Sequence, residues 1–314
     1  MQTLKGKVIK STGRWYMVQS GEEVFRCSLR GNFRLKGIRT TNPIAVGDNV
    51  EFTLEDGDET GLIQKVEERK NVIIRKATNL SKATHLLAAN LDLALVVVTP
   101  VFPRTSTGFI DRFLITAEAY HIPALIVINK IDILYGELEE YVQYYEEMYR
   151  FAGYDVRKVS ALEGNGIDDL RAELKDKVTL FTGHSGVGKS ALINALDSEH
   201  KLKTGDISHY HLKGKHTTTF AEMHPFSFGG YLIDTPGIKE FGVVDFEAWE
   251  LGHWFPDFKE FIPNCKFKNC THVGEPDCAV RAAAEEGRIH PERYHNYLSI
   301  LRNVEDEESD FKTS

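Results

Sequence analysis

The hydrophobic pattern of this chain changes character near residue 71. Before that point, short runs of alternating apolar and polar residues are separated by turn residues such as Gly, Asp and Ser. Alternation with a period of two is typical of half-buried strands, and five short strands in succession predict a small barrel such as an OB-fold. The predicted strands are Gly6–Ser11, Trp15–Gln19, Glu22–Leu29, Asn49–Leu54 and Gly61–Glu67.

Beyond residue 71, continuous apolar runs alternate with helical patterns. Leu91–Val98 is an almost unbroken apolar run, as expected for a strand that is buried on both faces of a parallel sheet. Alternation of strand and helix predicts a doubly wound α/β domain. Its predicted strands are Leu91–Val98, Ala124–Ile128, Val156–Val159, Val178–Phe181 and Tyr231–Ile233, and its helices are Gly108–Tyr120, Leu138–Phe151, Gly166–Leu174 and Ala191–Leu196.

The chain is therefore expected to be multi-domain. We assign residues 1–71 to the barrel, residues 72–240 to the α/β domain and residues 241–314 to a C-terminal domain with a cysteine-rich segment and a helix near Pro291. A length of 314 residues fits two or three domains. No heptad pattern is present, so we expect a monomer.

Charge is segregated along the chain. The formal net charge is −8, but residues 1–40 hold nine basic and two acidic side chains, so this part carries 9 − 2 = +7. Clustered basic residues with nearby aromatic rings such as Trp15 and Phe33 favour RNA binding by the barrel. The alternative is a positively charged face that only contacts water. The basic segment Arg30–Arg39 is expected to be a loop.

No apolar run indicates export or a membrane span. The longest run, Leu91–Phe102, contains Asp92 and Pro100 and falls short of the ~20 residues that a membrane helix needs. We therefore expect a cytoplasmic protein without a membrane contact.

The segment Gly183–Ser190 (GHSGVGKS) matches the phosphate-loop pattern G-x-x-x-x-G-K-[ST] in full. It follows a predicted strand and opens a predicted helix, which is the context the motif requires. Backbone N–H groups of such a loop converge on phosphate oxygens, Lys189 reaches the β- and γ-phosphates, and the Ser190 hydroxyl binds Mg²⁺. The candidate nucleotide-binding residues are Gly183, His184, Ser185, Gly186, Val187, Gly188, Lys189 and Ser190.

A second motif selects the base. Asn129-Lys130-Ile131-Asp132 follows a buried strand, where ligand-binding loops of such sheets lie. The Asp132 carboxylate can accept both N–H donors of the guanine edge, whereas adenine offers the wrong pattern. One strand later, Ser160 and Ala161 belong to a segment that supplies an N–H to guanine O6. Together with Asn129 and Lys130, these residues predict GTP rather than ATP.

The segment Asp234-Thr-Pro-Gly237 completes the nucleotide motifs. Asp234 is placed to hold Mg²⁺ through water, and the Gly237 N–H to sense the γ-phosphate. The preceding Thr-, His- and Gly-rich segment suits a switch loop in which Thr217 or Thr218 closes on Mg²⁺. Which of the two threonines binds stays open.

The order of these motifs differs from that of ordinary GTPases. The guanine motif at Asn129 precedes the phosphate loop at Gly183, and the Asp234 motif comes last. This order indicates a circular permutation, in which the same sheet is entered at a different strand. The last switch then leads directly into the C-terminal domain.

The residue after Gly237 bears on hydrolysis. Many GTPases place a water-orienting Gln there, but this chain has Ile238. The nearest polar candidate is His216, as a catalytic group. The alternative is a surface histidine in a segment that also contains His209 and His211.

Three cysteines and one histidine crowd into a short C-terminal stretch. Cys265, Cys270, His272 and Cys278 follow the spacing C-x₄-C-x-H-x₅-C. Four such ligands predict one structural zinc ion per chain and leave no open position for catalysis. The alternative is a group of buried thiols near an unrelated histidine. Cys27 stands alone in a strand and is expected to be a core thiol.

These motifs, over nearly the whole chain, resemble the ribosome small-subunit-dependent GTPase A family (RsgA/YjeQ). The family's switch motif G-R-H-T-T falls on Gly214–Thr218 with Lys215 in place of arginine, and its catalytic histidine falls on His216. The resemblance implies a cytoplasmic GTPase that converts GTP and water to GDP and phosphate. It also implies binding to the 30S subunit and its 16S rRNA late in maturation, stimulation by the subunit, and release favoured by hydrolysis.

Two other interpretations remain open. The chain could be an RNA-binding switch protein that uses GTP as a structural cofactor with negligible hydrolysis, because Ile238 cannot polarise water. It could also be a GTPase directed to tRNA or mRNA, because a basic barrel does not identify its RNA.

Overall fold

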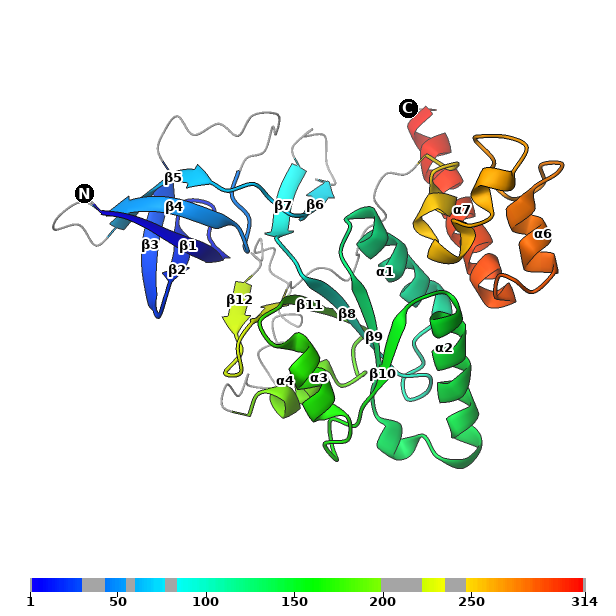
Figure 1. The fold of residues 1–314 in the computed structure, drawn as a ribbon, viewed down its shortest axis with the longest axis horizontal. Coiled ribbons are helices and arrows are strands. Elements are labelled where there is room, and N and C mark those ends of the chain that lie inside the picture. The colour runs from blue at the N-terminus through cyan, green and yellow to red at the C-terminus, as the bar shows by residue number, and fades with distance from the viewer. Residues whose placement is uncertain are drawn as a thin grey trace. The chain divides into compact units, whose positions relative to one another are not determined.

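A computed structural model describes residues 2–29, 43–54, 60–76, 84–198, 222–234 and 247–312 (Figure 1). The chain forms two compact units. The first comprises Met1–Ala94, Arg171–Phe181 and Leu196–Ile238, and the second comprises Leu95–Leu170, Thr182–Ala195 and Lys239–Ser314. The strands of the predicted α/β region are thus divided between the units.

The first unit begins with a closed five-stranded barrel. Its strands run in the order β1-β2-β3-β5-β4, and β4 pairs with β1 to close it. Only β3 and β5 pair in parallel. Inward-facing residues from Val8 to Ile63, including the Cys27 thiol, are buried in its core, which confirms the predicted barrel. The strands are β1 (Gln2–Ser11), β2 (Tyr16–Ser20), β3 (Glu23–Leu29), β4 (Asn49–Leu54) and β5 (Thr60–Val66).

The barrel shares its sheet with strands of the α/β region. Strand β1 pairs with β12 where Lys10 lies opposite Glu222, and the two side chains form an ion pair of 2.9 Å. The remaining strands of this unit are β6 (Val72–Lys76) and β7 (Thr84–Ala89), which form a hairpin, and β11 (Val178–Thr182), β12 (Glu222–Pro225) and β13 (Tyr231–Asp234). The hairpin and β12 were not predicted from the sequence.

Most of the other α/β elements belong to the second unit. Strands β8 (Leu93–Val98), β9 (Ala124–Ile128) and β10 (Asp155–Lys158) lie in the order β10-β9-β8, and β8 is buried throughout. The helices begin and end within two residues of the predicted ranges. They are α1 (Thr107–Ala119), α2 (Glu139–Phe151), α3 (Ile167–Leu174) and α4 (Lys189–Leu196), with short 3₁₀ turns η1 (Ile131–Ile133) and η2 (Gly136–Leu138).

The C-terminal region is a helical cluster that packs on α1. Ile115 of α1 is part of the same buried core as Leu251, Phe255 and Tyr297, and Figure 1 shows α7 beside α1. The elements are η3 (Leu251–Trp254), η4 (Pro256–Phe258), η5 (Ile262–Asn264), α6 (Ala279–Glu285) and α7 (Pro291–Lys312). The helix predicted near Pro291 is confirmed.

Among the helices of the described ranges, none combines the length and the hydropathy that a membrane crossing requires.

Candidate functional site

The phosphate-loop sequence forms a tight turn between β11 and α4. Gly183, Gly186 and Gly188 have φ values of 141°, 85° and 93°, which side-chain-bearing residues rarely adopt. A Cβ atom on Gly183 would collide with the Val97 carbonyl oxygen, and one on Gly188 with the Asn129 amide. Each of these glycines is therefore required by backbone geometry or by close approach.

Lys189 is folded into this loop. Its Nζ donates to the carbonyl oxygen of Gly183 and, at 2.8 Å, to that of His184. The His184 ring packs against Phe109 of α1, with 3.9 Å between the ring centroids and an angle of 34° between the ring planes. Burial, with smaller contributions from Lys189 and Arg112, lowers the pKa of His184. Two backbone carbonyl oxygens of the loop therefore hold the Lys189 ammonium group. Ser190 follows as the second residue of α4.

Asn129 joins three loops. Its side chain is 1% exposed, and its Nδ2 donates to the Val187 carbonyl oxygen in the phosphate loop at 2.9 Å. Its Oδ1 accepts from the Ala161 N–H at 3.2 Å. The backbone N–H of Asn129 donates to Val98 at the end of β8. One buried amide thus connects the base motif, the Ser160–Ala161 segment and the phosphate loop.

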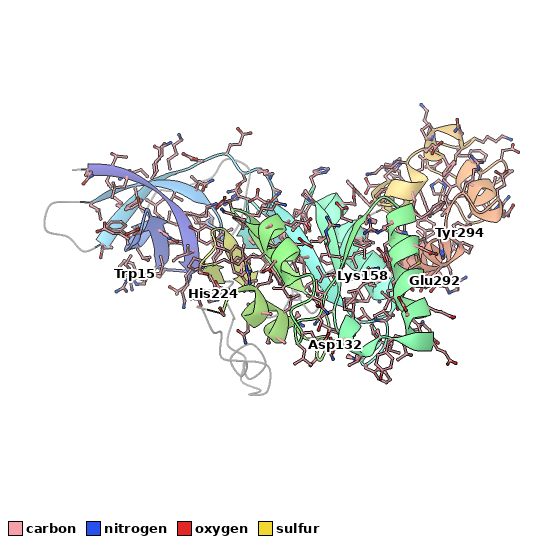
Figure 2. All side chains as sticks on the ribbon, turned by 60° about the horizontal axis from the view of Figure 1, so that its bottom comes forward. Trp15, Asp132, Lys158, His224, Glu292 and Tyr294 are labelled. Carbon is pink, nitrogen blue, oxygen red and sulfur yellow. The ribbon has the colours of Figure 1, made fainter. Side chains whose placement is uncertain are left out.

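The Asp132 carboxylate is oriented by its neighbour. The Ser160 hydroxyl donates to Asp132 Oδ1 at 2.6 Å and accepts from the Glu163 N–H at 3.0 Å. Lys130 has a left-handed backbone (φ 65°), and its Nζ donates to the Phe102 carbonyl oxygen at 2.9 Å. The structure therefore brings Asn129, Lys130, Asp132, Ser160 and Ala161 to one edge of the sheet, as the sequence predicts; Figure 2 labels Asp132 there.

Several predicted site residues lie outside the described residues. These are His216, Thr217, Thr218 and Gly237, and also Lys215 and Ile238. The backbone of Asp234 ends β13, but its side chain is not among those described. The roles given to these residues stay predictions.

The four predicted metal ligands lie together in the C-terminal region. The ligand atoms of Cys265, Cys270, His272 and Cys278 are all within 4.8 Å of one another. His272 Nδ1 lies 3.7 Å from the Cys265 sulfur and 3.5 Å from the Cys278 sulfur. Three thiols and one imidazole facing one point can hold a metal ion tetrahedrally.

The loop that carries these ligands is organised by Glu275. Its carboxylate accepts hydrogen bonds from the N–H and hydroxyl of Thr271 and from the N–H groups of Val273 and Gly274, at 2.6 to 3.2 Å. Partial burial opposes ionisation, but these hydrogen bonds lower the pKa of Glu275 to about 2. From α7, Tyr294 and Tyr297 donate to the carbonyl oxygens of His272 and Thr271 at 2.7 and 2.6 Å. Glu275 was not predicted from the sequence.

Burial sets the protonation states at the cluster. It raises the pKa of the Cys270 thiol to about 12 and lowers that of His272 to about 4. A neutral imidazole is the form that ligates, whereas a thiol must lose its proton to bind a metal. The charge of a divalent cation supplies the compensation that the buried thiolates need. The donor set therefore fits a structural metal ion.

Comparison with known proteins gives consistent matches. Residues 5–63 match the RsgA N-terminal domain and residues 66–244 match the RsgA GTPase domain. A relative named small ribosomal subunit biogenesis GTPase RsgA, from Bacteroides fragilis, is 53% identical over 304 residues, which are 96% of this chain and 98% of the relative.

Two solved structures share the fold along almost the whole chain. YjeQ from Thermotoga maritima matches with a TM-score of 0.78 and 38% identity, covering 96% of this chain and 99% of that one. YloQ, described as a circularly permuted GTPase, matches with a TM-score of 0.75 and 32% identity, covering 98% and 96%. These matches confirm the predicted fold class and the permutation. The chain is a GTPase of the RsgA family.

Proposed function

We propose that this protein is a GTP-hydrolysing factor in the biogenesis of the small ribosomal subunit. It binds the 30S subunit late in maturation, the subunit stimulates hydrolysis of GTP to GDP and phosphate, and hydrolysis favours release. The proposal is supported by relatives that carry this name and that match along nearly their full length.

The observation that carries the GTP assignment is the bridging position of Asn129. By contacting Val187 and Ala161 at once, its amide sets the spacing between the phosphate loop and the base-reading segment. Asp132, oriented by Ser160, then faces the guanine edge with a carboxylate acceptor. Guanine O6 would compete with Asn129 Oδ1 for the Ala161 N–H. This arrangement discriminates against adenine.

The remaining roles follow the motifs. Lys189 contacts the β- and γ-phosphates, and Ser190 binds Mg²⁺ together with Thr217 or Thr218. Asp234 holds Mg²⁺ through water, and the Gly237 N–H senses the γ-phosphate. His216 is the catalytic group, because Ile238 cannot orient water. One structural zinc ion at Cys265, Cys270, His272 and Cys278 stabilises the C-terminal domain.

The barrel is the proposed contact with 16S rRNA. Trp15 lies in the turn between β1 and β2 (Figure 2). The guanidinium groups of Arg26, on β3, and Arg14 lie 4.0 and 5.5 Å from the centroid of its ring. Both arginines are exposed. Cations beside an aromatic ring suit a phosphate backbone with stacked bases. We accordingly propose domains of residues 1–71, 72–240 and 241–314.

The test is GTP turnover with and without purified 30S subunits, using 50S subunits and the Lys189→Ala variant as controls. The proposal predicts a large increase in GTP turnover with 30S subunits but not with 50S subunits, and no increase for Lys189→Ala. Tight GTP binding without turnover under any condition would instead favour GTP as a structural cofactor. Equal stimulation by tRNA or mRNA would favour a different RNA target.

A further inference from the structure

Helix α1 is held on two opposite faces. Thr107 and Asp111 are four residues apart and share a face, because successive helical residues rotate by about 100°. Phe109 is two residues from each, about 200° around the helix, and therefore lies on the opposite face. The first face meets α7, and the second meets the phosphate loop.

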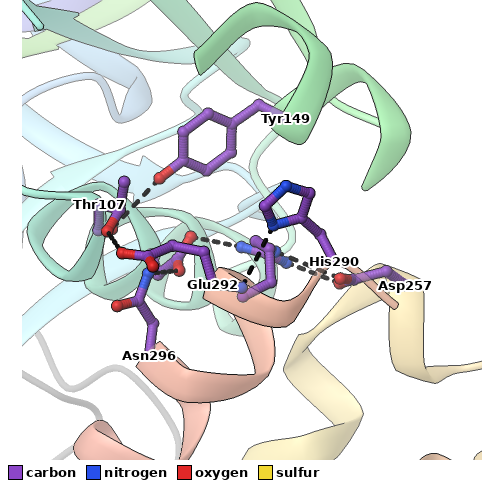
Figure 3. Close-up of polar contacts among 8 residues, drawn as sticks. Thr107, Tyr149, Asp257, His290, Glu292 and Asn296 are labelled. Carbon is purple, nitrogen blue, oxygen red and sulfur yellow. Dashed lines mark hydrogen bonds and ion pairs between the residues drawn. The ribbon is translucent and has the colours of Figure 1, made fainter. Parts of the chain in front are cut away.

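On the first face, α7 contacts both oxygens of the Asp111 carboxylate. Asp111 is fully buried; its Oδ1 pairs with Arg293 at 2.5 Å and its Oδ2 accepts from Asn296 at 2.7 Å. One turn earlier, the Thr107 hydroxyl donates to Glu292 at 2.8 Å (Figure 3). Both points of attachment are on the first two turns of α1.

Arg293 is itself fully buried and fully paired. Its guanidinium also bonds Asp257 at 2.7 and 3.3 Å and lies 4.8 Å from the centre of the Phe255 ring. Two carboxylates and one guanidinium out of water are costly unless their geometry is closely kept, so such a group tolerates few alternative arrangements. The register between α1 and α7 is therefore fixed.

On the second face, α1 reaches the phosphate loop through one ring contact. The Phe109 ring packs against the His184 ring with 3.9 Å between centroids, and the His184 carbonyl oxygen accepts from Lys189 Nζ at 2.8 Å. A shift or tilt of α1 consequently displaces His184, and with it an oxygen that holds the phosphate-binding lysine. The contacts from α7 to Lys189 form a continuous series through α1.

We propose that Phe109 is a positioning residue for the phosphate loop, and that Arg293 and Asn296 of α7 set its place through α1. The proposal rests on the proposed function, because it requires the loop to bind GTP. Tyr294 and Tyr297 of the same helix hold the metal-ligand loop. The C-terminal domain thereby has a route to the nucleotide that does not pass through the switch segments.

The first experiment measures the Kd of a fluorescent GDP for point variants. Phe109→Leu keeps an apolar side chain but removes the ring contact, and should weaken GDP binding about three- to tenfold. Phe109→Tyr restores a ring and should return the Kd to within about twofold of wild type. Phe151→Leu, at a phenylalanine of α2 that is 57% exposed, is the matched control and should leave the Kd unchanged.

The second experiment tests the connection from α7. Asn296→Ala should weaken GDP binding about two- to threefold in the wild-type background and have no further effect in Phe109→Leu, since both act through the same contact. Arg293→Met should weaken GDP binding more than Asn296→Ala does. Metal content and thermal midpoint identify variants that fail to fold, and if Arg293→Met is one of them, the milder Asn296→Ala decides the test.

The outcomes separate the two claims. Wild-type affinity in Phe109→Leu, or independent additive effects of Asn296→Ala and Phe109→Leu, would overturn the inference alone. Failure of the wild-type protein to bind GDP would overturn the proposed function, and the inference with it.

Discussion

The nucleotide loops and the metal cluster, both in the second unit, are built in opposite ways. The nucleotide site gathers residues that are far apart in sequence, from Asn129 to Val187, and one buried amide connects them. The metal cluster takes all four ligands from Cys265–Cys278, and one carboxylate, Glu275, orders the loop between them. The first site depends on the topology of the sheet, whereas the second depends on local chain geometry.

This difference determines how strongly each site depends on its bound ligand. Glycine backbones and the Asn129 amide already hold the backbone of the phosphate loop in shape, so binding of the nucleotide has to move the Lys189 side chain but not the backbone of this loop. At the metal cluster, burial raises the pKa of the Cys270 and Cys278 thiols, and a bound cation compensates the charge of their thiolate forms. The metal region should therefore depend on its ligand far more than the nucleotide loops do.

Removing one metal ligand has the largest expected effect. Cys270→Ser should abolish the bound zinc, expected at one per chain in wild type, while GDP binding persists, because the four ligands are separate from the phosphate loop. Metal analysis and fluorescent GDP titration measure both. Cys27→Ala, at the buried barrel thiol, is the control and should keep its metal. If a Cys265/Cys270 double variant retained zinc, these residues would not form the zinc site.

The next largest effect concerns hydrolysis. His216→Ala should reduce 30S-stimulated turnover by about 10²- to 10⁴-fold while leaving nucleotide affinity nearly intact, because a positioned acid–base group acts on the reaction rather than on binding. His209→Ala and His211→Ala are controls from the same segment. Stimulated turnover within a few-fold of wild type would exclude His216 and direct attention to Lys215 or to a ribosomal group.

A smaller effect is expected at Glu275. Glu275→Gln replaces one carboxylate oxygen, which accepts hydrogen bonds from backbone N–H groups, by an amide donor. The change should destabilise the C-terminal region by about 1–3 kcal/mol and weaken zinc binding about 10- to 100-fold. Because the pKa of Glu275 is lowered to about 2 from an ordinary 4.5, its stabilisation is present above about pH 4.5 and lost as the pH falls towards 2.

Zinc competition with a chelator and thermal melts at several pH values check this prediction. Glu285→Gln, at an exposed position of α6, is the control. Equal zinc affinity in Glu275→Gln and Glu285→Gln would show that Glu275 does not organise the ligand loop.

The smallest effect is on RNA affinity. Deletion of the barrel is a poor test, because β1 pairs with β12 and its loss would expose that strand. The double change Arg14→Ala and Arg26→Ala is sharper, and should reduce the slope of log K against log salt for 30S binding by about 1.4–1.8 units. Lys65→Ala, at a lysine paired with Glu51, is the control. An unchanged slope would exclude these arginines as phosphate contacts.

Contiguous motifs were the part of this protein that the sequence predicted well. The phosphate loop at Gly183 and the cysteine spacing are local patterns, and β11, the strand before the phosphate loop, is strongly apolar. The barrel and most α/β elements were predicted for the same reason. Apolar and polar residues alternate in the barrel strands between Val8 and Ile63, and Leu93–Val98 is a continuous buried strand.

Contacts between distant elements could not be predicted from one sequence. The Arg293–Asp111 pair joins residues 182 positions apart, and nothing local distinguishes either from an exposed charge. Glu275 was missed because an acidic residue in a polar loop is usually only solvated. The hairpin of β6 and β7 was missed because its first strand begins at the point where the pattern changes.

The specificity of Asp132 tests the central assignment most directly. Asp132→Asn, compared with Asp155→Asn at an exposed position of β10, should move preference from GTP to XTP, because an amide donor at residue 132 matches the acceptor that xanthine presents. Titration of both nucleotides against both variants measures this preference. We expect tighter XTP than GTP binding in Asp132→Asn alone. An unchanged preference for GTP would contradict the guanine site at Asn129–Asp132 and with it the assignment of the nucleotide loops.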